Sequence, residues 1–218
     1  MDSIDITSSR LTDLYARLPR VGKSRPGIEV DLSDELRELY GQAHRHYHTL
    51  RHVEECLSEF TEVFADCNDP MAVEMALWYH DIVYEPTSSD NERMSANKAT
   101  FDCARLGIEN PIFVTTVVNL VLATKHALAC TGDAAVVADI DLVILGSPWE
   151  RFSEYEQQIR QEYAHVSEKD FVAGRSHILD GFMRRPRIYQ TNMFLGRYEK
   201  KARGNIARSL MKLRSWRA

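Results

Sequence analysis

The stretch Met71–Tyr84 reads MAVEMALWYHDIVY and decides the fold, because as a helix it is apolar on two sides. Pro70, just before it, fits a first helical turn. The sequence therefore predicts a central helix with His80 and Asp81 near its end. An unpaired buried charge costs several kcal/mol, which approaches the whole free energy of folding. A proton, a basic partner or a cation must compensate it.

A His–Asp hydrogen bond within the core is the simplest explanation for an isolated pair of this kind. A divalent cation is the alternative, since it binds imidazole and carboxylate together. Two other segments of the chain carry the same ligand types, and these favour the cation.

The first of these segments is the histidine-rich run Ala43–Val53. His44, His48 and His52 recur every four positions, so we expect them along one face of a helix. His46 points elsewhere and is expected at the surface. His52 is the preferred metal ligand and His48 a weaker candidate, because the residues after His52 turn apolar, at Leu57, Phe60 and Phe64.

The second segment is the apolar run Ala134–Gly146, which contains Asp139 and Asp141. A strand would place both carboxylates on one solvated face. A helix with inward-facing carboxylates is favoured, because the neighbouring segments have helical patterns and Ser147–Glu150 resembles a capping box with proline at the first helical position.

Taken together, the ligands expected at one metal centre are His52, His80, Asp81 and either Asp139 or Asp141. Their order resembles the H...HD...D signature of the HD-domain superfamily of metal-dependent phosphohydrolases, which are all-α. Further motifs resemble a bacterial family of predicted HD phosphohydrolases, from about residue 35 to the C-terminus: Arg45–His52, Trp78–Tyr84, Asp90–Glu92, Asp139–Leu142 with Gly146, and Glu199 with Ala202–Asn205.

The resemblance implies hydrolysis of a small phosphate ester, with a nucleotide as one candidate, and a divalent ion: Mn, Co, Ni, Mg, Zn or Fe. In such a site the ion lowers the pKa of water and offsets phosphate charge. Arg51, Lys125 and His126 are candidate electrostatic donors, and Glu92 a candidate acid or base. Each has an alternative role: Lys125 as a helix C-cap, Glu92 in a capping box, and His126 as a second-metal ligand.

A further group of polar residues could contact substrate or form buried ion pairs, and the structural role is favoured for them: Arg160, Glu162, Tyr163, Arg175 and Arg203. Two alternative functions remain open at this stage. One is an HD-type di-iron oxygenase that uses His48 and His126. The other is a regulatory protein that binds a metal or nucleotide without turnover.

Composition limits the remaining choices. The chain has 218 residues, 44% of them hydrophobic, so we expect one all-α helical bundle. Its parts would be a helix and loop (1–30), the metal-site core (31–146) and C-terminal helices (147–218). Helices are expected up to residue 18, from Ser33, and over 70–84, 91–105, 111–126, 148–163, 167–183 and 193–216.

Net charge and cysteine spacing indicate which partners and which cellular compartment to expect. A net charge of −5 argues against long nucleic acids as partners, and leaves a small phosphorylated substrate and homo-oligomers open. The four cysteines lack CxxC spacing, so we expect free thiols in a reducing compartment. Neither a membrane-length apolar segment nor a basic secretory start is seen, and cytoplasmic location is expected.

Overall fold

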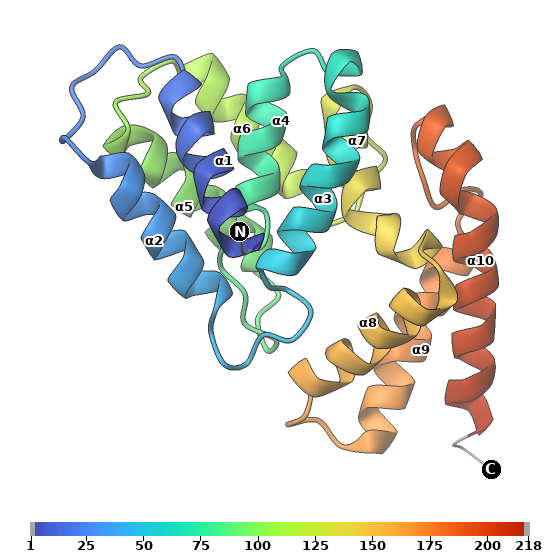
Figure 1. The fold of residues 1–218 in the computed structure, drawn as a ribbon. Coiled ribbons are helices and arrows are strands. Elements are labelled where there is room, and N and C mark those ends of the chain that lie inside the picture. The colour runs from blue at the N-terminus through green and yellow to red at the C-terminus, as the bar shows by residue number, and fades with distance from the viewer. Residues whose placement is uncertain (1–2, 216–218) are drawn as a thin grey trace. The chain divides into compact units, whose positions relative to one another are not determined.

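The computed structural model describes the backbone of residues 3–215 and the side chains of residues 9–215, and all regular elements in this range are helices (Figure 1). The all-α class is therefore confirmed. The α-helices are α1 (Ser3–Arg17), α2 (Ile28–Tyr40), α3 (Leu50–Val63), α4 (Pro70–Tyr79), α5 (Asn91–Arg105), α6 (Pro111–Ala123), α7 (Asp133–Asp141), α8 (Trp149–Glu162), α9 (Glu168–Arg184) and α10 (Asn192–Ser215). Short 3₁₀ helices follow α3 and α7: η1 (Phe64–Asp66) and η2 (Leu142–Gly146).

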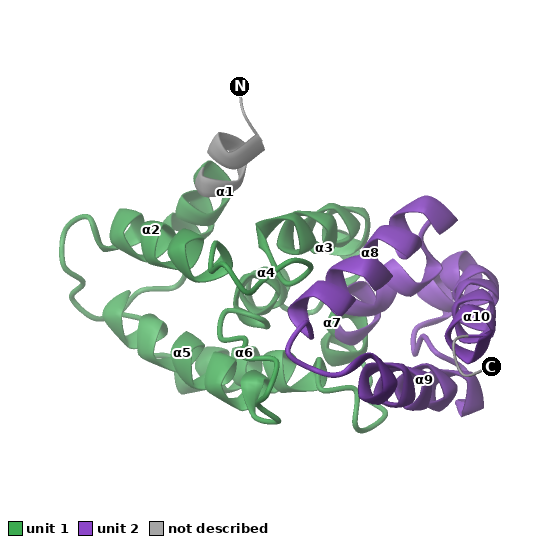
Figure 2. Ribbon diagram, turned by 90° about the horizontal axis from the view of Figure 1, so that it is seen from below, with its two compact units in different colours: residues 1–137 green, residues 138–218 purple. Residues whose placement is uncertain are grey.

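The helices form two compact units, residues 1–137 and residues 138–218 (Figure 2). Helix α7 contains the boundary between them. The single domain expected over residues 1–218 stays a prediction. Within the described residues, no helix combines the length and the apolar character needed to cross a membrane.

Helix α4 is the centre of the first unit, as its sequence predicts. Asp69 caps it by accepting a hydrogen bond from the backbone N–H of Ala72 at 3.0 Å, and Pro70 occupies the first turn. Every residue from Ala72 to Tyr79 is buried, and the helix packs against α1, α3, α5 and α6. Its apolar surface on two sides is thus covered by neighbouring helices (Figure 1).

The expected extension of α4 to Tyr84 is wrong, because the helix ends at Tyr79. The Arg45 guanidinium donates hydrogen bonds to the carbonyls of Asp81 and Ile82 at 2.7 and 2.9 Å. The Ser95 hydroxyl bonds the backbone N–H and C=O of Val83. Distant side chains therefore satisfy the backbone groups that a longer helix would have paired internally.

Three other expected features differ in the structure. The histidine run is no helical face, because α3 begins only at Leu50 and His44 and His48 lie in the preceding loop. Helix α2 begins at Ile28 rather than Ser33, whose hydroxyl bonds the Glu29 carbonyl at 2.8 Å instead of capping. Ser147 likewise forms no cap for α8, since its hydroxyl bonds the Val143 carbonyl at 3.4 Å.

Helix α6 also differs in its end, because it stops at Ala123 and not at residue 126. Its Asn110 cap accepts hydrogen bonds from the N–H groups of Ile112 and Phe113. The buried residues are Phe113, Val117, Leu120 and Val121, whereas Leu122 is 39% exposed. His126 lies beyond the end of the helix with a positive φ of 53°.

Helix α7 and η2 form the helical run that carries both aspartates, so the helical interpretation of residues 134–146 is confirmed. Gly146 is required there, because a Cβ would lie 2.7 Å from the Cβ of Tyr198. The Asn205 amide donates to the carbonyls of Leu145 and Ser147, each at 2.9 Å. Several motif residues of the resemblance therefore hold η2 against α10, which is a structural role.

Candidate metal centre

His80 lies directly after α4 and is 1% exposed. Its Nδ1 is 2.9 Å from the carbonyl oxygen of Leu77. Because a carbonyl can only accept, Nδ1 carries the proton and donates it. The lone pair of neutral His80 is then on Nε2, the tautomer that metal-bound histidines adopt when a carbonyl orients them.

His52, in the first turn of α3, brings a second imidazole to this nitrogen. It is 2% exposed, and its Nε2 lies 3.0 Å from Nε2 of His80. The Asp81 carboxylate adds an oxygen, with Oδ2 at 3.1 Å from His80 Nε2 and 3.6 Å from His52 Nε2. The structure thus brings three of the predicted ligands together inside the first unit.

The contact between His80 and Asp81 calls for a positive charge beside it. With its proton on Nδ1, neutral His80 presents a lone pair to the Asp81 oxygen, and two acceptors at 3.1 Å repel each other. A second proton on His80 or a bound cation resolves the conflict. The atoms form a triangle with sides of 3.0, 3.1 and 3.6 Å, whose circumscribed circle has a radius of about 1.9 Å. Metal–ligand distances of about 2.1 Å exceed this radius, so the three atoms fit one ion.

Cys56 belongs to the same cluster, although sequence reasoning missed it. Its Sγ lies 3.8 and 3.7 Å from Nδ1 and Nε2 of His52. One ligand atom from each of His52, Cys56 and His80 lies within 4.8 Å of the others, and all three residues are buried. This buried group can hold a metal ion. The four-residue spacing of His52 and Cys56 on one helix was the available sequence signal.

Arg45 positions the turn that carries His80 and Asp81, and sequence reasoning assigned it no role. Its side chain is buried, and besides the Asp81 and Ile82 carbonyls it donates to the carbonyl of His48 at 3.0 Å. One guanidinium therefore joins the loop before α3 to the turn after α4. Five fixed donors make arginine suited to this task.

Aromatic rings complete the surroundings of the cluster. The Tyr47 ring lies 4.7 Å from the His52 ring, and His48 stacks on Tyr84 at 4.0 Å between centroids. Burial raises the pKa of Tyr40 well above its ordinary value, and the charge of Asp81 adds to this effect. The Tyr40 hydroxyl therefore stays protonated and donates to the Trp78 carbonyl at 3.0 Å.

The other candidate catalytic residues also belong to the first unit. Lys125 bonds the Ser89 carbonyl at 3.1 Å and lies 4.0 Å from the Glu92 carboxylate, so these two candidates contact each other. Arg51 is half-exposed and pairs with Glu55 at 3.4 Å, one turn along α3. His126 is half-buried in the turn after α6. His46 is exposed, as expected.

The two aspartates of α7 have different surroundings. Asp139 is fully buried, and its carboxylate oxygens accept hydrogen bonds from the backbone N–H groups of Gln190 and Thr191, both at 2.7 Å. It thereby anchors the segment before α10 within the second unit. Asp141, the last residue of α7, is partly exposed.

The arginines named as possible substrate contacts form structural pairs. Arg175 is buried and binds the Glu156 carboxylate. Arg160 pairs with Glu168 at 3.0 Å, and Arg203 pairs with Glu199 at 2.7 Å. The same Glu199 carboxylate accepts backbone hydrogen bonds from Ile188 and Tyr189.

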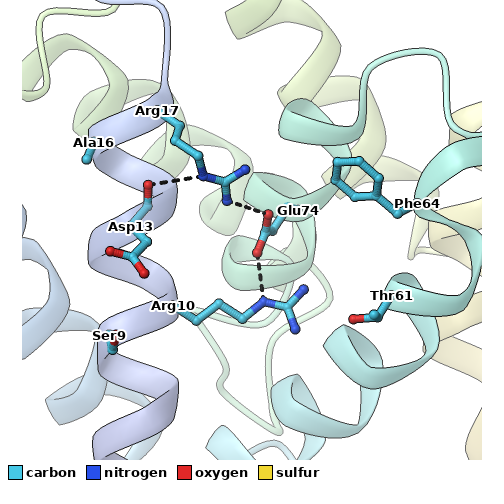
Figure 3. A pocket seen from close by; sticks show the side chains of 8 residues that line it. All are labelled: Ser9, Arg10, Asp13, Ala16, Arg17, Thr61, Phe64 and Glu74. Atoms are coloured by element: carbon cyan, nitrogen blue, oxygen red, sulfur yellow. Dashed lines mark hydrogen bonds and ion pairs between the residues drawn. The ribbon is translucent and has the colours of Figure 1, made fainter.

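A groove of about 840 Å³ lies elsewhere in the first unit, beside α1, α3 and α4 (Figure 3). Arg10 and Arg17 reach from α1 into it, and each binds one oxygen of the Glu74 carboxylate, at 2.8 and 3.1 Å. Its volume suits a small ligand. The buried carboxylate of Glu74 is nevertheless already paired with the two guanidiniums. The histidine cluster is therefore the better candidate for a functional site.

Comparison of the chain with protein-family models, with curated proteins and with solved structures gave no match. Function must therefore be inferred from the cluster itself.

Proposed function

We propose that this protein is a metal-dependent phosphohydrolase of the HD-domain type that cleaves a small phosphate ester, with nucleotides among the candidates. The observation that carries the proposal is the triangle of His52 Nε2, His80 Nε2 and Asp81 Oδ2, whose two nitrogens and one oxygen have the spacing of ligands around one ion. The H...HD...D order along the chain supports the same family.

Asp141 is our choice for the carboxylate that completes this order. The choice is made from the sequence pattern and from the role of Asp139, whose two oxygens already bind backbone N–H groups. Two imidazoles with carboxylates favour Mn, Fe, Co, Ni or Zn over Mg, which prefers oxygen ligands and retained water.

A bound ion would supply Lewis acidity, lowering the pKa of water and offsetting phosphate charge. The residues of the chain prepare for it. The Leu77 carbonyl holds His80 in the tautomer that presents Nε2, and Arg45 fixes the turn that carries Asp81. For phosphate contact we propose Lys125, Arg51 and His126, and for proton transfer Glu92. Lys125 is half-exposed, so its ammonium is accessible to solvent.

The test begins with elemental analysis of gently purified protein. Phosphate release is then screened across nucleotides and sugar phosphates with Mn²⁺, Co²⁺, Ni²⁺, Zn²⁺ and Mg²⁺. We expect about one equivalent or more of a transition metal, and metal-dependent phosphate release from one substrate class. If the protein binds metal and a ligand stabilises it but no phosphate is released, the proposed function changes from an enzyme to a regulatory protein. If the bound metal is iron and the protein takes up oxygen without releasing phosphate, the proposed function changes to an oxygenase.

A further inference from the structure

Cys56 has surroundings that set it apart from the other buried cysteine of the chain. Burial raises the pKa of the Cys103 thiol to about 12, and the nearby charge of Asp102 adds to this effect. Such a thiol behaves as a small packed group. Cys56 is equally buried, at 2% exposed, but its sulfur lies beside the imidazole ring of His52, 3.8 Å from Nδ1 and 3.7 Å from Nε2.

The spacing of these atoms suits two ligands of one ion. A sulfur at about 2.3 Å and a nitrogen at about 2.1 Å from the same ion stand about 3.6 Å apart at the tetrahedral angle. Cys56 Sγ lies 3.7 Å from His52 Nε2 but also 3.8 Å from Nδ1, so it packs beside the ring. A rotation about the Cα–Cβ bond of Cys56 brings the sulfur to the lone-pair side of Nε2 when the ion binds. Both residues project from the same face of α3, one turn apart, so a single rigid helix sets their separation.

We infer that Cys56 binds the metal as a thiolate. This inference rests on the metal centre of the proposed function, and goes beyond it by naming the chemical class of the ion. The thiol releases its proton to solvent as the sulfur–metal bond forms. A thiolate beside two imidazoles selects Zn²⁺, Co²⁺, Ni²⁺ or Fe²⁺ and disfavours Mg²⁺ and Ca²⁺.

Cobalt provides a direct readout that does not depend on activity. The full chain is stripped with a chelator, reconstituted with Co²⁺ and followed by absorption spectroscopy. We expect visible d–d bands together with an intense near-ultraviolet sulfur-to-cobalt charge-transfer band. Cys56→Ser should lose the charge-transfer band while retaining d–d bands, and its Kd for Co²⁺ should rise by at least about 10-fold, the loss that even outer-shell partners produce.

Cys103→Ser is the matched control, since it removes a buried thiol outside the cluster, and it should keep the charge-transfer band. A wild-type spectrum without the charge-transfer band overturns the inference even if a variant fails to fold. Cobalt bound with d–d bands but without charge transfer overturns Cys56 as a ligand and leaves the metal centre standing. A band that persists in Cys56→Ser also overturns it. A chain that binds no Co²⁺ overturns the metal centre itself, and with it the proposed function.

Discussion

At the scale of single residues, the proposed metal binding depends on which ring nitrogen of His80 carries the proton. The Leu77 carbonyl holds the proton of His80 on Nδ1, and Nε2 then faces Asp81 and His52. Removing either His80 or Asp81 takes away one corner of this triangle of ligand atoms. His80→Ala or Asp81→Ala should therefore abolish both bound metal and hydrolysis, as measured by elemental analysis and phosphate release.

The control for this prediction is His46→Ala, which removes an exposed histidine from the loop before α3, and which should keep full metal stoichiometry. Asp141→Asn should share the loss of metal. Asp139→Asn should instead lower stability, because Asp139 anchors Gln190 and Thr191. Full metal content in either His80→Ala or Asp81→Ala would show that the cluster is not the metal centre.

Arg45 is the residue whose loss should most disturb the geometry of the cluster. Its guanidinium donates to the carbonyls of His48, Asp81 and Ile82. Each buried carbonyl left without a donor costs about 1–3 kcal/mol, so Arg45→Ala should lower the free energy of unfolding by roughly 3–5 kcal/mol. Urea unfolding measures this change. Arg51→Ala, which removes a half-exposed arginine, should cost less than about 1 kcal/mol, and equal losses would contradict the positioning role.

At the scale of helices, α1 is held on α4 by the ion pairs of Glu74 (Figure 3). The carboxylate is 3% exposed, whereas Arg10 and Arg17 are 33% and 49% exposed, so solvent screens the arginine side of each pair. Glu74→Gln keeps the volume but removes the charge, and we expect a loss of about 1–3 kcal/mol.

Hydrogen exchange locates the effect of this substitution. Amides of α1 should exchange faster in Glu74→Gln, because the helix loses its charged link to α4. Asp34→Asn, which breaks the exposed pair with Arg37 on α2, is the control and should change α1 exchange little. Uniform loss of protection over all helices would argue against a local docking role.

The contact between α2 and α5 should make stability depend on acid pH. Partial burial acts to raise the pKa of Glu35, but hydrogen bonds from Arg105 and Lys98 outweigh it and lower the pKa below its ordinary value. Glu35 therefore contributes stability above its unfolded pKa, and this contribution is lost as pH falls through the lower folded pKa. Urea unfolding at several pH values should show that the free energy of unfolding falls less steeply toward acid pH in Glu35→Gln than in wild type. Equal falls in the free energy of unfolding for the variant and the wild type would rule out this contribution.

At the scale of the whole molecule, a metal bound to the native cluster must stabilise the fold by mass action. An ion at 100 times its Kd adds about 2.7 kcal/mol, which raises Tm by roughly 5–10 °C in a chain of this length. Thermal unfolding with a chelator, and after adding Zn²⁺ or Co²⁺, measures this shift. Mg²⁺ at equal concentration should shift Tm less, and His80→Ala should respond to none of them. An unchanged wild-type Tm would speak against a native metal centre.

Local patterns in the sequence determined the helical class, the central position of α4 and the burial of His80 at its end. Apolar periodicity and the Asp69–Pro70 start act within a few residues, so they can be recognised without the fold. The same rules predicted a helix through His44 and His48 and a longer α4, and both were wrong. Arg45 pairs with carbonyls as far as 37 positions away, and no local pattern contains that contact.

Only the tertiary structure decided which polar groups meet. The 3.0 Å approach of His52 to His80, the place of Cys56 beside them and the use of Asp139 as a backbone anchor all depend on how separate segments pack. The residue types predicted a metal site, because imidazoles and carboxylates rarely enter an apolar core unpaired. Their directions followed from hydrogen bonds between segments far apart in the chain, and these form only when the helices have assembled.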